Sequence, residues 1–292
     1  EMQRSLVGSE MCIRDSYFTI WTGKCQAYCP LFCIFVHFVP RSGQAERGRR
    51  RWNETAQTSY NRFVETIELS ERAEHGAYLS YLYNTLLTDA AALGGRGDIE
   101  FYGGRAAVRI EIPDAAAFAG RMRSAVAEVL CVGYKYIFLK ERLRVCLPAR
   151  ERRLLAAALI AADYEGDRAY VVGKIPSGRL CAVDGVYAFR LGALREKWER
   201  IVAYIPAGFS VPDLRRFCEF LAGESRNKIY LKDNAVYGED FVPLRRSRLT
   251  GAEDVETEII LSDAGLIYCL GEVEDSLGDF LQKYYAERAI FS

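Results

Sequence analysis

The sequence predicts a protein that mixes helices and strands, of the α+β or α/β class. A strand pattern, a helical pattern and a hairpin at Gly103-Gly104 follow one another early, Ala- and Leu-rich helical patterns fill the middle, and strands and helices alternate again at the end. We therefore expect an N-terminal split-βαβ, ferredoxin-like half, a helical middle and a small C-terminal α/β unit. Apolar residues make up 50% of the chain, enough for a packed core.

The first 62 residues differ from the rest. They carry nine Lys/Arg and five Asp/Glu, a net charge of +4, whereas the remaining 30 and 34 give residues 63–292 a net charge of −4. The stretch "LVGSEMCIRDS" resembles translated sequencing-adapter read-through, so we expect residues 1–16 to be non-native and residues 17–62 to be an upstream region translated in frame. The predicted organisation is a non-native or disordered leader (1–62), an α+β region (63–147), and a helical and α/β region (148–292).

Three functional interpretations of this leader stay open. The apolar run "CPLFCIFVHFV" is too short to span a membrane but has the length of a signal-peptide core. Cys25, Cys29 and Cys33 recur every four residues, a wider spacing than the C-x-x-C pairs of common metal sites. The run "RGRRRW" has the charge of a nucleic-acid contact.

The N-terminal region begins with the strand pattern "RFVETIEL". A helix should follow over residues 70–93, with Ser70 as its N-cap and glycines after Leu93 ending it. The segment 98–112 predicts a hairpin, and 114–143 predicts a long Ala-rich helix with a kink near Gly133.

The middle of the chain predicts a helix over 148–165, with Pro148 in its first turn. The segments 168–175 and 178–189 have strand character, and 189–205 predicts one amphipathic helix with a continuous apolar stripe.

In the C-terminal part, capping and turn residues mark where the predicted helices and strands begin and end. A helix should span 210–223, because Ser210 and Asp213 form a capping-box pattern. A hairpin should turn at Asp233-Asn234. Residues 252–263 fit a helix or a strand, and the end predicts a strand, a helix and a short strand, with the two strands adjacent and parallel.

A search for catalytic chemistry finds little. Of the two histidines, His37 lies in the leader, and His75 has no Ser, Cys or carboxylate partner at a recognised spacing, so we expect an exposed helix residue there. Phosphate-loop, dinucleotide and zinc motifs are absent. The five cysteines past residue 62 should be small buried hydrophobes. The sequence therefore predicts no catalytic, cofactor-binding or metal-binding residue.

One segment favours polyanion binding. Arg245, Arg246 and Arg248 form the basic run "LRRSRL", which follows the aromatic hairpin "KIYLKDNAVY". A solvated loop is the competing interpretation, and the zero net charge of the whole chain argues against a general polyanion binder.

The segment "VDGVYAFRLGALREKW" resembles a motif of a known protein family. From about residue 63 to the end, the chain resembles the YtxC family of sporulation proteins of endospore-forming bacteria, in which a Gly, an aromatic residue and Phe-Arg-Leu open a long charged helix. Gly185, Phe189, Arg190 and Leu191 fill those places. Gly192-Ala193 departs from the charged pair expected next, and "IPAGFSVPD" departs from an acidic turn with a tyrosine.

The resemblance implies a cytoplasmic protein that is active around sporulation, without an established biochemical activity. We therefore expect a protein that needs no cofactor, does not enter a membrane and acts through contacts with an unknown protein partner. A nucleic-acid-binding module is the main alternative. An enzyme that uses carboxylates and an arginine is a third, for which the sequence ranks no residues.

Overall fold

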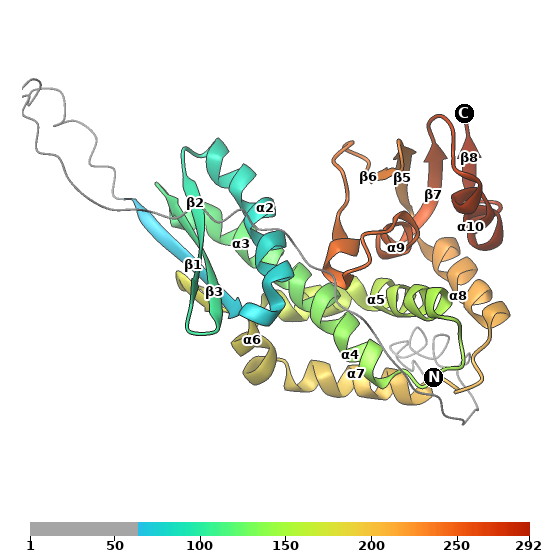
Figure 1. The fold of residues 1–292 in the computed structure, drawn as a ribbon, viewed down its shortest axis with the longest axis horizontal. Coiled ribbons are helices and arrows are strands. Elements are labelled where there is room, and N and C mark those ends of the chain that lie inside the picture. Colours follow the sequence, from blue (N-terminus) through green and yellow to red (C-terminus); the bar gives the residue numbers. More distant parts are fainter. Residues whose placement is uncertain (1–63) are drawn as a thin grey trace, which may run out of the picture.

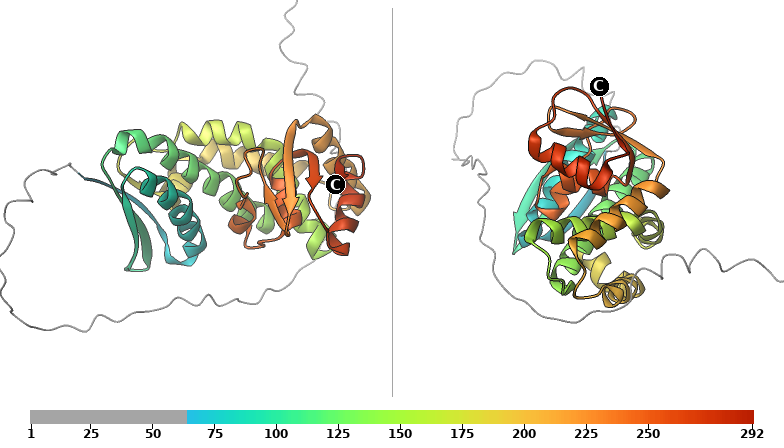
Figure 2. Two further views of the ribbon diagram at one scale, coloured as in Figure 1. Left: turned by 90° about the horizontal axis from the view of Figure 1, so that it is seen from above. Right: turned by 90° about the vertical axis from the view of Figure 1, so that its right-hand side faces the viewer.

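The computed structural model describes residues 64–292, so the interpretations of residues 1–62, including the clustered cysteines and the basic run, lie outside the described residues. Two four-stranded sheets lie at opposite ends of the described part, and a layer of helices joins them (Figure 1 and Figure 2). The expectation of a mixed α and β protein is confirmed.

The N-terminal sheet has the strand order β2-β3-β1-β4. β3 is antiparallel to both β1 and β2, and β4 is parallel to β1. Both Gly103 and Gly104 have positive φ, which is why the predicted hairpin turns there. β4 comes after residue 147, yet it completes this sheet. The strands are β1 (Glu65–Arg72), β2 (Arg96–Tyr102), β3 (Arg105–Ile112) and β4 (Leu180–Ala182).

The helix after β1 starts later than the sequence predicts. Ser70 pairs with Ala107 inside the β1–β3 ladder, so it is a strand residue and the prediction of an N-cap at Ser70 is wrong. The ladder continues to Arg72 because every residue of β1 has a partner on β3. A 3-10 turn (Ala73–His75) then leads into α2 (Gly76–Ala92).

The long Ala-rich helix is one continuous helical stretch of three parts. Asp114 caps it by accepting from the Ala117 amide at 3.0 Å. The expected interruption near Gly133 is a π-helical turn, an insertion that interrupts the regular hydrogen-bond pattern of an α-helix. The parts are α3 (Ala115–Glu128), the π-helical turn (Val129–Tyr134) and α4 (Lys135–Arg142).

The middle of the chain is more helical than the sequence predicts. The expected strand at 168–175 is wrong, because α5 (Ala149–Val172) continues into it as far as Val172 and a turn follows. Buried Asp167 and Val171 lie one turn apart there, and such tertiary contacts outweigh the strand preference of Tyr and Val. Of the strand expected at 178–189 only β4 forms. The amphipathic helix breaks at Leu191 into α6 (Val183–Arg190) and α7 (Gly192–Tyr204).

The C-terminal unit follows the predicted order. The capping box of Ser210 and Asp213 starts α8, and Asp233 and Asn234 turn the hairpin with φ of 50° and 55°. The sheet order is β6-β5-β7-β8, with parallel β7 and β8. Residues 252–263 contain a helix, α9. The elements are α8 (Val211–Glu224), β5 (Asn227–Lys232), β6 (Ala235–Tyr237), η3 (Arg246–Thr250), α9 (Val255–Leu261), β7 (Ala264–Cys269), α10 (Asp275–Tyr285) and β8 (Ala289–Phe291).

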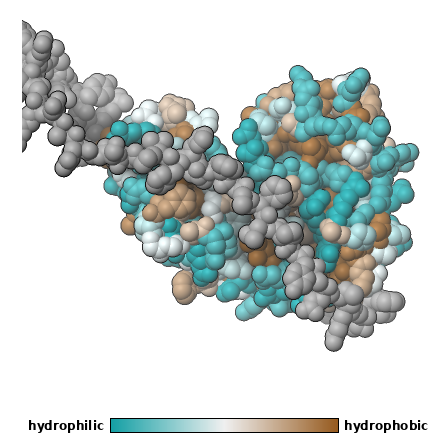
Figure 3. Space-filling model, in the orientation of Figure 1, coloured by the Kyte–Doolittle hydropathy of each residue, from teal (hydrophilic) through white to brown (hydrophobic). Residues whose placement is uncertain are grey.

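One buried apolar cluster runs through both ends and the helical layer. Cys131, Cys181, Cys218 and Cys269 are buried as expected, whereas Cys146 is exposed. Burial raises the pKa of Cys131 and Cys218 to about 12, which suits inert thiols. Figure 3 shows a largely hydrophilic surface interrupted by apolar patches at both ends. In the described part, no helix is both long and apolar enough to cross a membrane.

Candidate functional site

Side chains from three segments that are distant in sequence meet at the end of β1. Glu71 is the central residue, and strand alternation places it on the inner face of the sheet with Ile67 and Leu69. Its side chain is fully buried, with 0% exposure. A buried carboxylate is costly unless hydrogen bonds compensate for lost water. The Glu71 cluster consists of Glu71, His75, Tyr78, Tyr134 and Tyr187.

Two donors and an imidazole nitrogen surround the Glu71 carboxylate. The Tyr134 hydroxyl donates to Oε2 at 2.6 Å, and the Arg72 amide donates to Oε1 at 2.8 Å. His75 Nδ1 lies 3.4 Å from Oε1. The arrangement orients the imidazole by a carboxylate, as acid–base sites in proteins commonly do.

Aromatic rings form a shell around these polar atoms. The His75 ring centroid is 5.4 Å from that of Tyr78 and 5.6 Å from that of Tyr134, which in turn lies 4.4 Å from Tyr187. The π-helical turn supplies Tyr134, and its Gly133 allows the Tyr78 ring to approach, because a Cβ there would lie 2.7 Å from Tyr78 Cε1. π-helical turns are frequent at functional sites.

An ion pair closes the cluster on the outer side. Arg105 of β3 donates to Asp184 of α6 through both Nη atoms, at 3.0 and 2.7 Å. The hydrogen bonds from Arg105 hold the pKa of Asp184 below its ordinary value, so the pair stays charged near neutral pH. α6 thus contributes both Asp184 and Tyr187, and it is fixed from two sides.

The residues that carry the family resemblance lie on this same helix. Gly185 lies within α6, where a Cβ added to it would be 3.4 Å from the Cβ of Ala182. Arg190 donates to the Lys174 carbonyl at 3.2 Å, and Leu191 is completely buried between α6 and α7. Phe189 instead points to solvent and is 89% exposed. Arg190 and Leu191 therefore anchor the end of α6, whereas Phe189 is presented outward.

The cluster favours a protonated His75 and a protonated Tyr134 hydroxyl. The hydrogen bond to Glu71 raises the pKa of His75 above its ordinary value, although burial acts in the opposite direction. Burial, together with the hydrogen bond to Glu71, raises the pKa of Tyr134, so its hydroxyl stays protonated. His75 is the only histidine in the part of the chain that the structure describes.

We expect the stability of the protein to depend on pH through His75. Because the pKa is higher in the folded state, His75 stabilises the fold fully below the unfolded value of about 6.5, and this contribution disappears as the pH rises through the folded-state pKa. The free energy of unfolding of the wild type relative to His75→Gln should therefore be larger at pH 5.5 than at pH 8.5. Urea unfolding measures this difference. The same difference at both pH values would contradict the expected shift.

Sequence reasoning missed this site. It assigned His75 to an exposed helix and found no carboxylate partner at a recognised spacing. The indication was present in "VETIELSER", where strand alternation places Glu71 on the same face as Ile67 and Leu69. The prediction of an N-cap at Ser70 hid this pattern, because it ended the strand before Glu71.

The three arginines of the basic run do not lie alike. Arg245 is exposed, and Arg248 is exposed with its Nε 4.0 Å from Glu253. Arg246 turns inward, where its Nε donates to Glu128 at 2.7 Å and its guanidinium lies 4.3 Å from the Tyr164 ring centroid. Arg246 thus connects the C-terminal unit to the helical layer.

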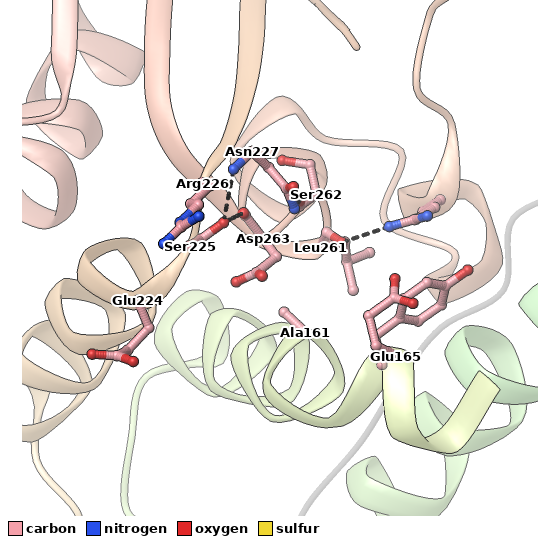
Figure 4. Close-up of a pocket in the computed structure, with 11 residues that line it drawn as sticks. Ala161, Glu165, Glu224, Ser225, Arg226, Asn227, Leu261, Ser262 and Asp263 are labelled. Carbon is pink, nitrogen blue, oxygen red and sulfur yellow. Dashed lines mark hydrogen bonds between the residues drawn. The ribbon is translucent and has the colours of Figure 1, made fainter. Parts of the chain in front are cut away.

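A polar cleft of about 310 Å³ lies beside this connection. Figure 4 shows Ala161 and Glu165 of α5 on one side and Ser225, Ser262 and Asp263 on the other. Several of its polar atoms bond within the protein, since Ser225 Oγ donates to the Asp263 carbonyl. Within residues 64–292, no group of three or more His, Cys, Asp or Glu side chains is arranged to hold a metal ion.

No family model, curated protein or solved structure matches this chain. The fold and the site define a two-sheet α and β protein with a buried carboxylate–histidine–tyrosine cluster next to the motif helix α6.

Proposed function

We propose that this chain is a cytoplasmic, sporulation-associated protein of the YtxC type that acts by binding another protein. The sequence resemblance supports the biological setting. The exposure of Phe189 is the observation that carries the mode of action, because this residue belongs to the motif and yet makes little contact within the fold. A motif residue that does not serve the core is a candidate for contact with a partner.

The surroundings of Phe189 suit a docking residue. The buried side chain of Leu191 and the bond from Arg190 to the Lys174 carbonyl hold the end of α6, so the phenyl ring is presented from a fixed backbone. Leu180, in the neighbouring edge strand β4, is also 70% exposed. Aromatic side chains on rigid elements lose little entropy on binding and often dominate an interface.

We also propose that β1, α2, β2 and β3 form a ferredoxin-like half. Its support is the order of the strands: β1 and β2 run in the same direction, α2 joins them, and β3 lies between them. The parallel edge strand β4 departs from the all-antiparallel sheet of that fold.

Replacing Phe189 with Ser should impair spore formation without unfolding the protein. The side chain is almost fully exposed, so the melting temperature should stay within about 1–2 °C of the wild type. Loss of a central aromatic anchor typically weakens a contact by about 30-fold. The measurement is the yield of heat-resistant spores in an endospore former whose own gene is replaced by the variant.

Tyr204→Ser is the matched control, because Tyr204 is also an exposed aromatic residue but lies at the far end of α7. It should leave the spore yield unchanged. A normal yield after deletion of the gene would refute the sporulation role. A reduced yield on deletion combined with a normal yield for Phe189→Ser would refute the contact at Phe189.

A further inference from the structure

The outer face of the C-terminal sheet carries a row of aromatic residues. Tyr230 lies on the central strand β5, opposite Tyr237 of β6 on one side and Tyr268 of β7 on the other. Their side chains point to the same side, because directly paired residues share a face of the sheet. We call this surface the tyrosine face, and it consists of Lys228, Tyr230, Lys232, Tyr237, Phe241 and Tyr268.

No helix within residues 64–292 covers this face. The alternating residues Ile229, Leu231 and Ile267 are buried on the opposite side, where they join the core cluster with apolar residues of α8, α9 and α10. On the tyrosine face the lysines are exposed and the tyrosines are partly exposed. The described part of the chain therefore leaves an open, aromatic sheet surface at this end.

The aromatic rings form a stack. The Tyr230 ring lies between Phe241, at 4.4 Å and 23°, and Tyr268, at 5.3 Å and 19°. The outer side of the stack is open, since Phe241 is 57% exposed. A further flat ring can extend the stack at Phe241 with the same offset geometry.

A strained loop holds Phe241 on the stack. Its φ is +56°, which is rare for a bulky residue that is not glycine. The loop is held by backbone bonds from Phe241 to the Gly238 carbonyl and from Gly238 to the Val242 carbonyl, both at 3.0 Å. The chain thus tolerates an unfavourable backbone conformation that places an exposed ring over Tyr230.

Two exposed lysines of β5 lie on this face. Lys228 and Lys232 lie two residues on either side of Tyr230, so their Cα atoms are about 6–7 Å along the strand from that of Tyr230. The acidic neighbours lie in the adjoining loop: Glu239 Oε1 accepts from the Lys228 amide at 3.4 Å, and Asp240 accepts from the Val242 amide at 3.1 Å. The combination is a stacking surface with a lysine on either side along β5 and the carboxylates of Glu239 and Asp240 in the adjoining loop.

We propose that the tyrosine face binds single-stranded nucleic acid, with an unpaired base stacked on Phe241 and the neighbouring phosphates near Lys228 and Lys232. Unstacked bases on aromatic side chains, with lysines at the backbone, are the usual chemistry of single-strand recognition. This site is separate from α6 and goes beyond the proposed protein contact at Phe189.

Fluorescence anisotropy with 12-nucleotide oligo(U), oligo(dT) and a 12-base-pair duplex tests the proposal on the 292-residue chain. We expect both single strands to bind more tightly than the duplex, because duplex bases cannot stack on Phe241. A preference for oligo(U) over oligo(dT) would assign the site to RNA, and the reverse to DNA. Two lysine–phosphate contacts predict that affinity falls about 7-fold from 50 to 200 mM salt.

Phe241→Ala should weaken single-strand binding by about 5- to 100-fold, the range found for one stacked base. Lys228→Ala with Lys232→Ala should flatten the salt dependence. The matched controls are Tyr204→Ala and Lys140→Ala, which remove an exposed aromatic ring and an exposed cation elsewhere. Comparison between variants also cancels any contribution of the basic run "RGRRRW", which all of them share.

Three results would overturn the proposal. One is no binding to either single strand at 50 mM salt. Another is equal binding of duplex and single strands. The third is a Phe241→Ala variant that binds as the wild type does, since the attraction would then be electrostatic only. Any of these would leave the face to a protein partner, and none affects the test of Phe189.

Discussion

Replacing Asp167 with Asn should lower the free energy of unfolding by about 3–5 kcal/mol, the usual cost of breaking a buried ion pair from one side. Asp167 is fully buried, and its Oδ2 lies 2.8 Å from Nζ of Lys135, which is itself only 1% exposed. The Trp198 indole also donates to this carboxylate at 2.8 Å. Without the negative charge, the Lys135 ammonium keeps only Asp163, at 3.4 Å.

The pKa of Asp167 is shifted in the direction expected for a stabilising ion pair. Burial raises it, but the charges of Lys135 and Lys197 outweigh burial and hold it below its ordinary value. A carboxyl group whose pKa is lowered on folding contributes stability above its unfolded value of about 3.9, and this contribution is lost as the pH falls through the folded value. The effect of Asp167→Asn should therefore be full at pH 7 and shrink in acid.

Urea unfolding at pH 7 measures the loss, and a second variant shows its cause. Adding Lys135→Met to Asp167→Asn removes the uncompensated cation and should recover part of the lost stability. Arg215→Gln is the control, because its pair with Glu219 is on the surface, where such pairs contribute little. A double variant no more stable than Asp167→Asn would show that the buried charge is not the cause.

Gly265→Ala should destabilise the protein by about 2–4 kcal/mol, as forced overpacking does. A Cβ on Gly265 would lie 2.2 Å from the Ser225 carbonyl oxygen. This neighbour is backbone, so it cannot rotate away. The reason for the close approach is a bulge: Asn227 pairs with Ala264 and Lys228 with Leu266, which leaves Gly265 as the extra residue of β7.

Gly120→Ala should have the opposite effect on the stability of the same protein. Gly120 lies inside α3 with no atom within 4 Å of a Cβ, so alanine should stabilise the helix by about 1 kcal/mol. Thermal unfolding of both variants tests the pair. A Gly265→Ala variant as stable as the wild type would show that Ser225, at the end of α8, does not approach β7 as described.

Local chemistry explains which elements the sequence predicts well. Gly103-Gly104, Asp233-Asn234 and the Ser210/Asp213 capping box specify their turns and helix start through neighbouring atoms alone, and all three are confirmed. The segment 168–175 failed for the opposite reason. Its helix is favoured by contacts of Asp167 with Lys135 and Trp198, which are about 30 residues away in the sequence.

The candidate site depends even more on distant contacts. Glu71 meets Tyr134 across 63 residues, and Arg105 meets Asp184 across 79. Arg245 and Arg246 show the same limit. They are adjacent in one basic run, yet Arg245 faces solvent and Arg246 donates to the Glu128 carboxylate. Spacing along the chain does not predict which distant residues will be in contact. Strand alternation, by contrast, does predict that the Glu71 side chain points to the inner face of the sheet.

β4 is the last strand of the N-terminal sheet to be synthesised, and this has a consequence for folding on the ribosome. The start of β4, Leu180, lies 68 positions after the end of β3, Ile112. At ordinary translation rates the nascent chain therefore exposes the outer margin of β1 for about 3–14 s before its last strand is made. During that interval the unpaired backbone is open to pairing with another nascent chain, and chaperone-rich cells should give the better yield of native protein.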